Sequence, residues 1–425
     1  MKIAIIGGGI SGNTAAYYLS KAHDVTLFES EKRLGGHTHT HSVELEGKEL
    51  SVDSGFIVFN DWTYPEFIKI LDSLNVDSVE SEMSFSVRCE RTGLEYSGTN
   101  LNTLFSQRKN IFSPSFIGLL RDILRFNQSS VQFLAEGGSE ITLGEFLRQG
   151  GFGKKLIDYY VVPMGAAIWS TDPALMLEFP ARFFLRFLKN HGLLNVNDRP
   201  VWRVIKGGSS QYLKAMTKGY KDRICLDSAV ERISRSEVGA TVYLQDGHKA
   251  FFDAVFISTH SDQALAMLEN PTKAERETLS AIPYQNNSAV LHRDLSLLPR
   301  TKRAWSAWNY HIPDSTQERV GVTYNMKILQ RLDIQEPVLV TLNYDHAIDP
   351  KKVIKRMNYA HPLFTLEGAG AQVRHGEING TLNTWYCGAY WRNGFHEDGV
   401  VSALNAIEHF EKYHERKSWD LRRAG

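Results

Sequence analysis

The sequence predicts an α/β fold in which a Rossmann-like domain with a parallel sheet is interrupted by an inserted α+β domain. Three observations support this prediction. The first 36 residues read as a strand, a glycine loop, a helix and a second strand. Residues 114–190 then show helical periodicity, and strand patterns resume near residue 200. At 425 residues the chain is long enough for two domains.

The glycine loop at the N-terminus has a spacing with a physical meaning. An apolar strand at 2–6 runs directly into Gly7, Gly9 and Gly12, which match G-x-G-x-x-G. The first glycine allows a tight turn, the second lets the backbone approach a pyrophosphate, and the third lets the helix pack on the sheet. Glu29, about 20 residues further on, is placed to bind ribose hydroxyls. The pattern therefore predicts dinucleotide binding, and the alternative is a purely structural glycine-rich turn.

Composition excludes several classes of protein. Lys+Arg and Asp+Glu balance at 48 each, which argues against a nucleic-acid partner. The three cysteines are too widely spaced for a disulfide framework or a metal knuckle, and they fit a reducing compartment. The first strand begins at Lys2 without a signal peptide, and no apolar run reaches the ~20 residues of a membrane span. We therefore expect a cytoplasmic protein.

Helical patterns dominate the second hundred residues. Ser113-Pro114 is a helix start, and Thr142-Leu-Gly-Glu145 has the form of a capping box. Basic residues alternate with apolar ones in the helices expected around 114–125 and 179–189. Such helices can lie on an anionic membrane surface, which would make the protein membrane-associated. The alternative is that their apolar faces pack in the core and their cations face water.

The residues after the second strand carry a resemblance. Glu29 to Gly36 matches E-x-x-x-R-x-G-G through Arg33, Gly35 and Gly36, with His37 where arginine is usual. In this respect the chain resembles the flavin-containing amine oxidase superfamily, which includes monoamine oxidases, phytoene-type desaturases and protoporphyrinogen oxidase. The resemblance implies that the cofactor is FAD, with the arginine and the Gly-Gly turn at its diphosphate.

Further segments resemble the same family. Residues 203–213 resemble its Gly-Gly-x-x-x-Leu signature, and residues 384–404 match its C-terminal strand, loop and helix. We expect this last helix to begin at Val401. Residues 224–233 are expected to form one strand that ends in the adenine contact. The resemblance implies a set of FAD-binding residues: Gly7, Gly9, Ile10, Ser11, Gly12, Glu29, Arg33, Gly35, Gly36, His37, Gly55, Phe56, Val230, Thr259, Gly388, Gly399 and Val400.

These signatures divide the chain. They predict a discontinuous FAD-binding domain at 1–65, 200–262 and 376–425, and a substrate-binding domain at 66–199 and 263–375. His37, His39 and His41 would share one face of a strand, but no further ligand set accompanies them, so we expect no metal. Covalent flavin attachment through Cys387 or His37 has no support from the family patterns.

Two features of the family's amine oxidases are missing. The stretch 282–292 has no lysine to reach the flavin N5, and Phe395 replaces the tyrosine expected in the C-terminal loop. No catalytic residue is therefore assigned. His260 is either an acid/base or a helix cap. Candidates for contact with substrate, each also explained by ordinary packing, are Trp169, Asn287, His292, Trp308, Tyr324, Trp391 and His396.

Three functions follow from this pattern. The first is an FAD-dependent oxidoreductase that dehydrogenates an apolar, fatty-acyl-like substrate by hydride transfer to flavin N5, and it predicts a long apolar tunnel. The resemblance suggests a bacterial branch that acts on membrane fatty acyl chains. The second is an amine or amino-acid oxidase, with a short pocket and a charged anchor. The third is a non-catalytic flavin-binding regulatory or partner subunit. The sequence does not give the electron acceptor.

Overall fold

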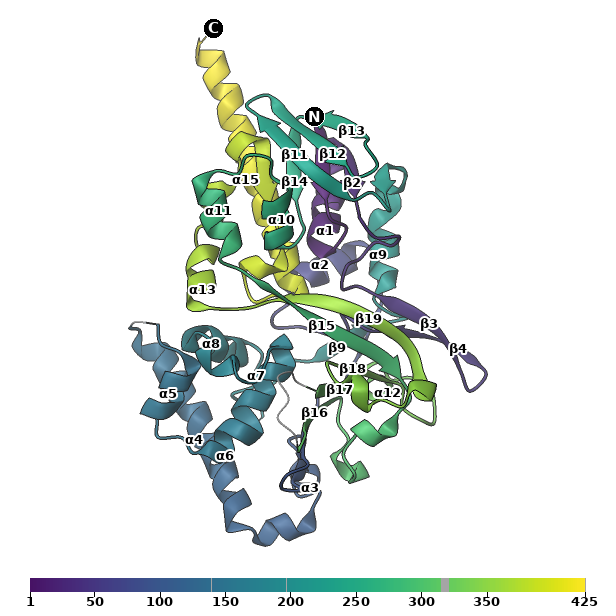
Figure 1. Ribbon diagram of the computed structural model, residues 1–425, viewed down its shortest axis with the longest axis vertical. Helices are drawn as coiled ribbons and strands as arrows, with labels where there is room; N and C mark the ends of the chain where they lie inside the picture. The colour runs from purple at the N-terminus through teal and green to yellow at the C-terminus, as the bar shows by residue number, and fades with distance from the viewer. Residues whose placement is uncertain (139, 196, 315–320, 425) are drawn as a thin grey trace.

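The computed structural model describes residues 1–138, 140–195, 197–314 and 321–424, with side chains of the last helix described as far as Arg416. The molecule is elongated, and both termini lie at one end (Figure 1). Two halves of different construction follow one another along the long axis. The half with the termini carries the parallel sheet, and the other half combines a curved, mostly antiparallel sheet with a group of helices (Figure 1).

A five-stranded parallel sheet forms the centre of the first half. Its order is β10-β2-β1-β14-β20, with Ile3 of β1 paired to Val25 on one side and to Ala254 on the other. Its strands are β1 (Lys2–Ile6), β2 (Asp24–Phe28), β10 (Ile224–Cys225), β14 (Ala254–Ile257) and β20 (Thr384–Tyr386). Parallel strands buried on both faces are expected to be apolar, and β14 and residues Ile3 to Ile6 of β1 are.

Each face of this sheet is covered by different elements. Ile3 and Ile5 pack with α1 (Ile10–Leu19) and α15 (His396–Ala424). Ala4 and Ile6 point to the opposite face, because side chains alternate along a strand. That face is covered by a three-stranded antiparallel sheet and two helices: β11 (Val230–Ser236), β12 (Gly239–Leu244), β13 (Lys249–Phe252), α10 (Ser261–Met267) and α11 (Lys273–Ser280).

Smaller elements complete this half and join it to the other. Helix α2 (Pro65–Ser73) packs on α15, and β9 (Trp202–Ile205) pairs with two short strands. The remaining elements are β3 (Thr40–Leu45), β4 (Lys48–Asp53), β5 (Phe59–Asn60), β6 (Ser78–Glu80), α9 (Ser210–Met216), α13 (Leu366–Gln372) and α14 (His375–Ile378).

The second half pairs a seven-stranded sheet with helices. Its strand order is β19-β15-β18-β17-β16-β7-β8. The strands are β7 (Phe85–Cys89), β8 (Glu95–Ser97), β15 (Tyr284–His292), β16 (Trp308–Ile312), β17 (Gly321–Asn325), β18 (Leu339–Leu342) and β19 (Val353–Pro362). The helices are α3 (Leu101–Leu104), α4 (Pro114–Glu136), α5 (Leu143–Gln149), α6 (Lys154–Leu156), α7 (Val162–Trp169), α8 (Ala181–Asn190) and α12 (Met326–Leu329). One large apolar core joins helices and sheet.

Several local predictions are confirmed. Ser113 caps α4 by accepting from the Phe116 N–H, and Thr142 and Glu145 form the capping box of α5. The apolar face of α8 packs in the core of the second half, as the alternative to a membrane-bound helix predicted, and on α4 this holds for Phe116, Leu119 and Phe126 but not for Ile117, Leu124 and Val131, which are exposed. The domain boundaries at residues 65, 200, 262 and 376 stay a proposal.

Three local predictions are wrong. The strand expected at 224–233 is two strands in different sheets, because the chain reverses at Asp227, whose φ is +53°. The last helix begins at His396 rather than Val401, since the Asp398 carboxylate accepts from the Phe395 N–H and closes an earlier first turn. The three histidines do not share a strand face, because β3 begins only at Thr40 and His37 lies in the preceding loop.

Candidate cofactor and substrate cavity

One cavity of about 1520 Å³ joins the two halves. At one end its wall is the glycine loop after β1, the 29–37 segment and residues 228–231. At the other end its wall consists of side chains from α3, α4 and α7 and from the seven-stranded sheet. The volume exceeds the roughly 300–1,000 Å³ of an ordinary small-molecule pocket, as expected for a cavity that takes both a dinucleotide and a substrate.

The glycines of the first loop differ in what surrounds them. A Cβ on Gly12 would lie 1.9 Å from the Gly7 carbonyl oxygen, so this position excludes any side chain. Gly7 has a φ of +100°, which favours glycine. A Cβ on Gly9 would meet nothing within 4 Å, although Gly9 lines the cavity and is the N-cap of α1 without a side-chain cap. Open space and uncapped N–H groups at a helix N-terminus fit a bound diphosphate.

Glu29 and Arg33 have partners within the chain. The Glu29 carboxylate accepts from the Gly8 N–H at 2.8 Å and from the Glu31 N–H at 2.9 Å, which fixes it in the wall at the end of β2. Carboxylate oxygens have further lone pairs, so ribose hydroxyls can still bind. The Arg33 guanidinium donates to backbone carbonyls, among them that of Gly36 at 2.9 Å. It therefore braces the Gly-Gly turn while lying in the cavity wall itself.

His37 lies where the glycine turn meets the second half. Its ring stacks against Tyr359 and His361, with centroid distances of 5.1 and 5.0 Å. Its Nε2 is buried and has no hydrogen-bond partner among the described residues. A Cβ on Gly55 would lie 2.1 Å from the His37 carbonyl oxygen, so the two backbones touch. An unpartnered nitrogen in the cavity wall is a further feature that a bound cofactor would satisfy.

The C-terminal segment closes the cavity from another side. Gly388 lines it, and its N–H donates to the Ser402 hydroxyl at 2.9 Å. A Cβ on Gly399 would lie 2.6 Å from Ile10 Cγ2, so this glycine lets α15 approach the start of α1. Val400 is fully buried. These contacts hold the N-termini of α1 and α15 side by side.

The structure brings fourteen of the seventeen proposed cofactor residues into the cavity wall. The three that lie behind the wall are Gly12, Gly399 and Val400. Gly12 and Gly399 are packing positions, as the close approaches above show. The fourteen in the wall are Gly7, Gly9, Ile10, Ser11, Glu29, Arg33, Gly35, Gly36, His37, Gly55, Phe56, Val230, Thr259 and Gly388.

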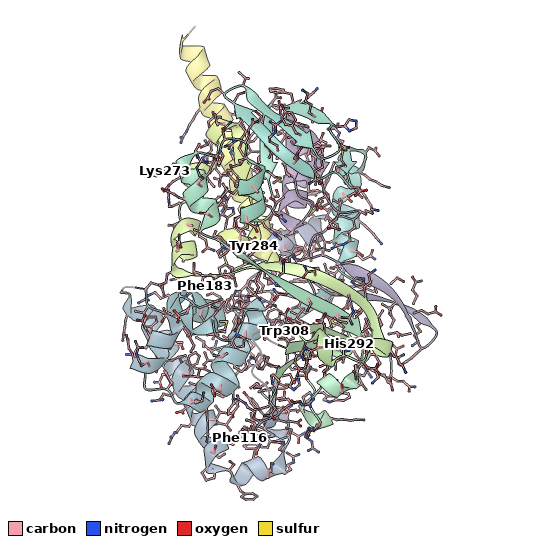
Figure 2. All side chains as sticks on the ribbon, in the orientation of Figure 1. Phe116, Phe183, Lys273, Tyr284, His292 and Trp308 are labelled. Carbon is pink, nitrogen blue, oxygen red and sulfur yellow. The ribbon has the colours of Figure 1, made fainter. Side chains whose placement is uncertain are left out.

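The cavity continues deep into the second half. Trp169, Trp308 and Tyr324 line it, and the rings of Trp308 and Tyr324 meet edge to face at 5.0 Å. Figure 2 shows Tyr284 at the junction of the halves and Trp308 between the helices and the sheet. From there the wall follows one face of the middle of α4, with residues spaced i, i+3, i+4 and i+7. These residues are Leu120, Ile123, Leu124 and Asn127.

Three substrate-contact candidates lie outside this wall. His292 is buried at the end of β15, where its Nε2 pairs with the Thr341 hydroxyl at 2.7 Å. Trp391 stacks on His375 in the core of the first half. Asn287 is fully buried and pairs through Nδ2 with His361 Nδ1 at 2.7 Å. Sequence did not show this, because the packing of distant elements decides whether a residue of a strand, as for Asn287 and His292, or of a short helical turn, as for Trp391, faces the cavity.

The structure adds two wall residues that sequence reasoning missed. Tyr359 and His361 lie on the same face of β19, two positions apart, and both line the cavity. The Tyr359 hydroxyl pairs with Ser54 Oγ at 2.7 Å and so ties β19 to the first half. The alternation of Met357, Tyr359 and His361 could have indicated one face of a strand. The signal is weak because β19 is long and both of its faces mix polar and apolar residues.

Burial keeps the histidines of this region neutral at pH 7. It lowers the pKa of His361 to about 4 and that of His396 to about 3. The pKa of His37 lies well below its usual value because of burial first and the His361 ring second. His396 stacks flat on Phe56 at 3.6 Å and pairs with the Tyr212 hydroxyl at 2.8 Å, so it positions the start of α15.

His260 lies both at the start of a helix and in the cavity wall, and its role as an acid/base stays a prediction. It directly precedes α10, where its N–H donates to Gln263 Oε1 at 3.4 Å. Its ring also lines the cavity and stacks on Tyr284 at 4.1 Å. Burial lowers its pKa, so the ring is neutral at pH 7. In the described ranges no group of histidines, cysteines or carboxylates has the arrangement of a metal site.

Comparison with known proteins defines the class. Residues 10–293 match the model of the flavin containing amine oxidoreductases, and the chain belongs to this family. The cofactor of the family is FAD, and the open Gly9 loop, the uncapped α1 N-terminus and the unpartnered His37 Nε2 fit it.

Among its relatives, the chain is 24% identical over 302 residues to an L-amino-acid oxidase from Siganus canaliculatus, which covers 68% of this chain and 56% of that protein. It is 27% identical over 224 residues to protoporphyrinogen oxidase 2 of Arabidopsis thaliana, covering 50% and 42%. The chain thus spans about half the length of these curated relatives.

Solved structures share the fold over nearly the whole chain. Cyclohexylamine oxidase from Brevibacterium oxydans matches with a TM-score of 0.69 at 15% identity, over 97% of this chain and 99% of that one. A CLA-producing fatty acid isomerase from P. acnes matches with a TM-score of 0.69 at 17% identity, over 96% and 98%. Within the described residues, no helix combines the length and hydropathy needed to cross a membrane.

Proposed function

We propose that this protein is an FAD-dependent oxidoreductase that dehydrogenates an apolar, fatty-acyl-like substrate. The observation that carries the proposal is the continuation of the cofactor cavity along the apolar face of α4, past Trp308 and Tyr324. Bound FAD supplies the hydride acceptor, and the chain must hold the reacting carbon and exclude water. A wall built from tryptophan, tyrosine, leucine and isoleucine side chains suits an acyl chain and offers few partners to water.

The charges around the cavity support an uncharged reacting centre. Its described acidic wall residues, Glu29, Glu31 and Glu231, all belong to the nucleotide end. In the second half the described wall therefore has no carboxylate to anchor an ammonium group. Its described lysine is Lys355, which is six residues from His361 and so roughly 20 Å away along β19. The neutral histidines add no permanent charge.

The match to the fatty acid isomerase shows that this fold can accommodate an acyl substrate. A protein with this architecture acts on a fatty acid, and the two structures superpose over almost their full lengths. At 17% identity the likeness concerns the fold, so the support for an acyl substrate comes from the cavity wall of this chain.

Blocking the tunnel tests the proposal. Ile123 lines the cavity on α4, whereas Val131 on the same helix is 42% exposed and lies outside the wall. We expect Ile123→Trp to reduce turnover of long acyl substrates at least tenfold while shorter chains are spared, and Val131→Trp to change neither. Acyl-chain analysis of lipids from cells that express each variant measures the product. Equal activity of both variants on all chain lengths would contradict an acyl tunnel along α4.

A second candidate, an amino-acid oxidase, is favoured by one observation. Arg199 lines the cavity and is exposed, so a guanidinium is available to a substrate carboxylate. The relative from Siganus canaliculatus is an L-amino-acid oxidase. Peroxide release from L-amino acids that disappears in Arg199→Gln, together with unchanged cellular acyl chains, would favour this function over the first.

A further inference from the structure

The end of the molecule farthest from the termini carries exposed apolar side chains. This tip consists of α3, the turn at Arg108–Phe112 and the first half of α4 (Figure 1). Phe112 is 86% exposed and Leu101 is 74% exposed. Ile111, Ile117 and Leu124 are also exposed, so the apolar residues form a group. Single exposed apolar residues are ordinary, but a group of them at one site indicates a binding surface.

The tip is also a mouth of the cavity. Leu101 and Leu124 line the cavity, yet they are 74% and 58% exposed. Each of these two side chains therefore belongs to the inner wall and to the outer surface. An apolar molecule can pass from outside the protein to the tunnel along α4 without leaving apolar contact.

Cations surround these apolar residues. Residues 100–126 contain four basic residues, Arg108, Lys109, Arg121 and Arg125, against one acidic residue, Asp122. Arg108, Lys109 and Arg121 are exposed. Lys155 of the neighbouring helix α6 is exposed as well and donates to the Ser115 hydroxyl at the start of α4. Apolar side chains ringed by lysine and arginine are the composition of an interfacial membrane contact.

We propose that the tip docks on an anionic phospholipid bilayer. Phe112 and Leu101 enter the boundary between headgroups and acyl chains, and the cations bind lipid phosphates. A second copy of the chain fits less well, because a two-fold contact would bring the same positive residues together. The proposed docking does not depend on the proposed function. The entry of an acyl chain from the bilayer through the Leu101–Leu124 mouth does depend on the proposed function.

Flotation of the holoprotein with vesicles tests the docking. We expect binding to vesicles that contain phosphatidylglycerol, weaker binding to pure phosphatidylcholine, and a loss of binding as salt rises. Phe112→Asp should lower the partition coefficient at least tenfold, and Lys109→Glu should lower it severalfold. The matched control is Val238→Asp, because Val238 is 78% exposed but lies in the β11–β12 turn at the opposite end. Flavin absorbance shows that each variant is folded.

The possible results distinguish membrane docking from self-association and from the proposed function. Absence of binding to anionic vesicles, or equal losses in Phe112→Asp and Val238→Asp, overturns the docking surface. A change in oligomeric state by light scattering in Phe112→Asp, without a change in vesicle binding, assigns the tip to self-association and also overturns it. Vesicle binding without acyl turnover supports the docking and contradicts the proposed function instead, since flotation measures no chemistry.

Discussion

The two halves of the cavity are built in different ways. At the nucleotide end the wall is backbone: Gly9 leaves open space beside uncapped N–H groups, and Gly12 and Gly55 would overlap neighbouring carbonyl oxygens if they carried a Cβ. At the substrate end the wall is side chain, with Trp169, Trp308 and the apolar face of α4. The first kind of wall tolerates few residue types at fixed spacings, and the second accepts many.

This difference explains why the sequence of the nucleotide end indicates its ligand and the sequence of the substrate end does not. A backbone site leaves glycines in the sequence, and its ligand is shared across a family. A side-chain site changes its ligand by exchanging one large residue for another, with no pattern to mark it. The following four predictions test this contrast, from the largest expected effect to the smallest.

Gly12→Ala should have the largest effect. Its Cβ would lie 1.9 Å from the Gly7 carbonyl oxygen, and neither backbone can move without distorting β1 and α1. We expect purified protein with little or no flavin and a free energy of unfolding lower by about 3 kcal/mol. Gly118→Ala in α4 is the control, because nothing lies within 4 Å of that Cβ. Flavin absorbance measures the flavin content, and urea unfolding measures the free energy of unfolding. A Gly12→Ala protein with full flavin would contradict the close-packed loop.

Gly9→Val separates the cofactor site from the fold. Gly9 has a φ of −74°, and its Cβ direction is open, so valine costs the apoprotein little. Its methyl groups would occupy the space assigned to the diphosphate, and FAD affinity should fall about 100-fold, or about 2.7 kcal/mol.

Gly98→Val is the matched control for this change. Gly98 also lines the cavity with nothing within 4 Å of its Cβ, but at the substrate end. Fluorescence titration of deflavinated protein with FAD compares the two variants. Similar affinities would show that the diphosphate does not lie at Gly9.

Glu397→Ala should weaken the contact between two distant segments. The Glu397 carboxylate is buried and accepts from the Glu66 and Phe67 N–H groups at 2.9 and 2.8 Å, so α15 caps α2. Loss of such a cap costs about 2 kcal/mol. Glu415→Ala, exposed on the same helix, should change stability by less than about 0.5 kcal/mol. Equal urea midpoints for the two variants would count against the cap.

His396→Gln should change how stability depends on pH. Burial lowers the pKa of His396 to about 3 from 6.5, so between these values the unfolded chain binds a proton that the folded chain does not. Folding stability therefore falls as pH falls below 6.5, by about 1 kcal/mol between pH 6.5 and 5.5. In the variant this loss should be smaller by that amount, which is roughly 2 °C in Tm.

Asp53 and Asp398 act in the opposite direction over the same pH range. Burial raises the pKa of both to about 6, so they stabilise the fold at low pH and lose that effect as pH rises through 6. Both are present in the wild type and the variant, so the difference between the two proteins isolates His396. His248→Gln, exposed in the β12–β13 turn, is the control. Identical pH profiles for His396→Gln and the wild type would contradict a neutral buried ring.

Much of the site could be predicted because local chemistry determines it. The strand–loop–helix unit at 2–19, the Ser113 cap and the Thr142–Glu145 capping box each depend on residues a few positions apart. Asn287, His292 and Trp391 could not be placed in this way. Whether a strand residue faces a cavity or a core depends on which element packs on the sheet, and that partner is far away in the chain.

By itself the sequence determined the nucleotide half: the order of its elements, the FAD signature and the neutral overall charge. It could do so because the glycines of the first loop follow from the strand–turn–helix geometry of that loop, where a Cβ on Gly12 would overlap the Gly7 carbonyl oxygen. Only the tertiary structure decided that Tyr359 and His361 face His37, that Glu397 caps α2, and that the cavity runs along α4 to an apolar tip. These features join residues that are tens to hundreds of positions apart, and packing of the whole chain brings them together.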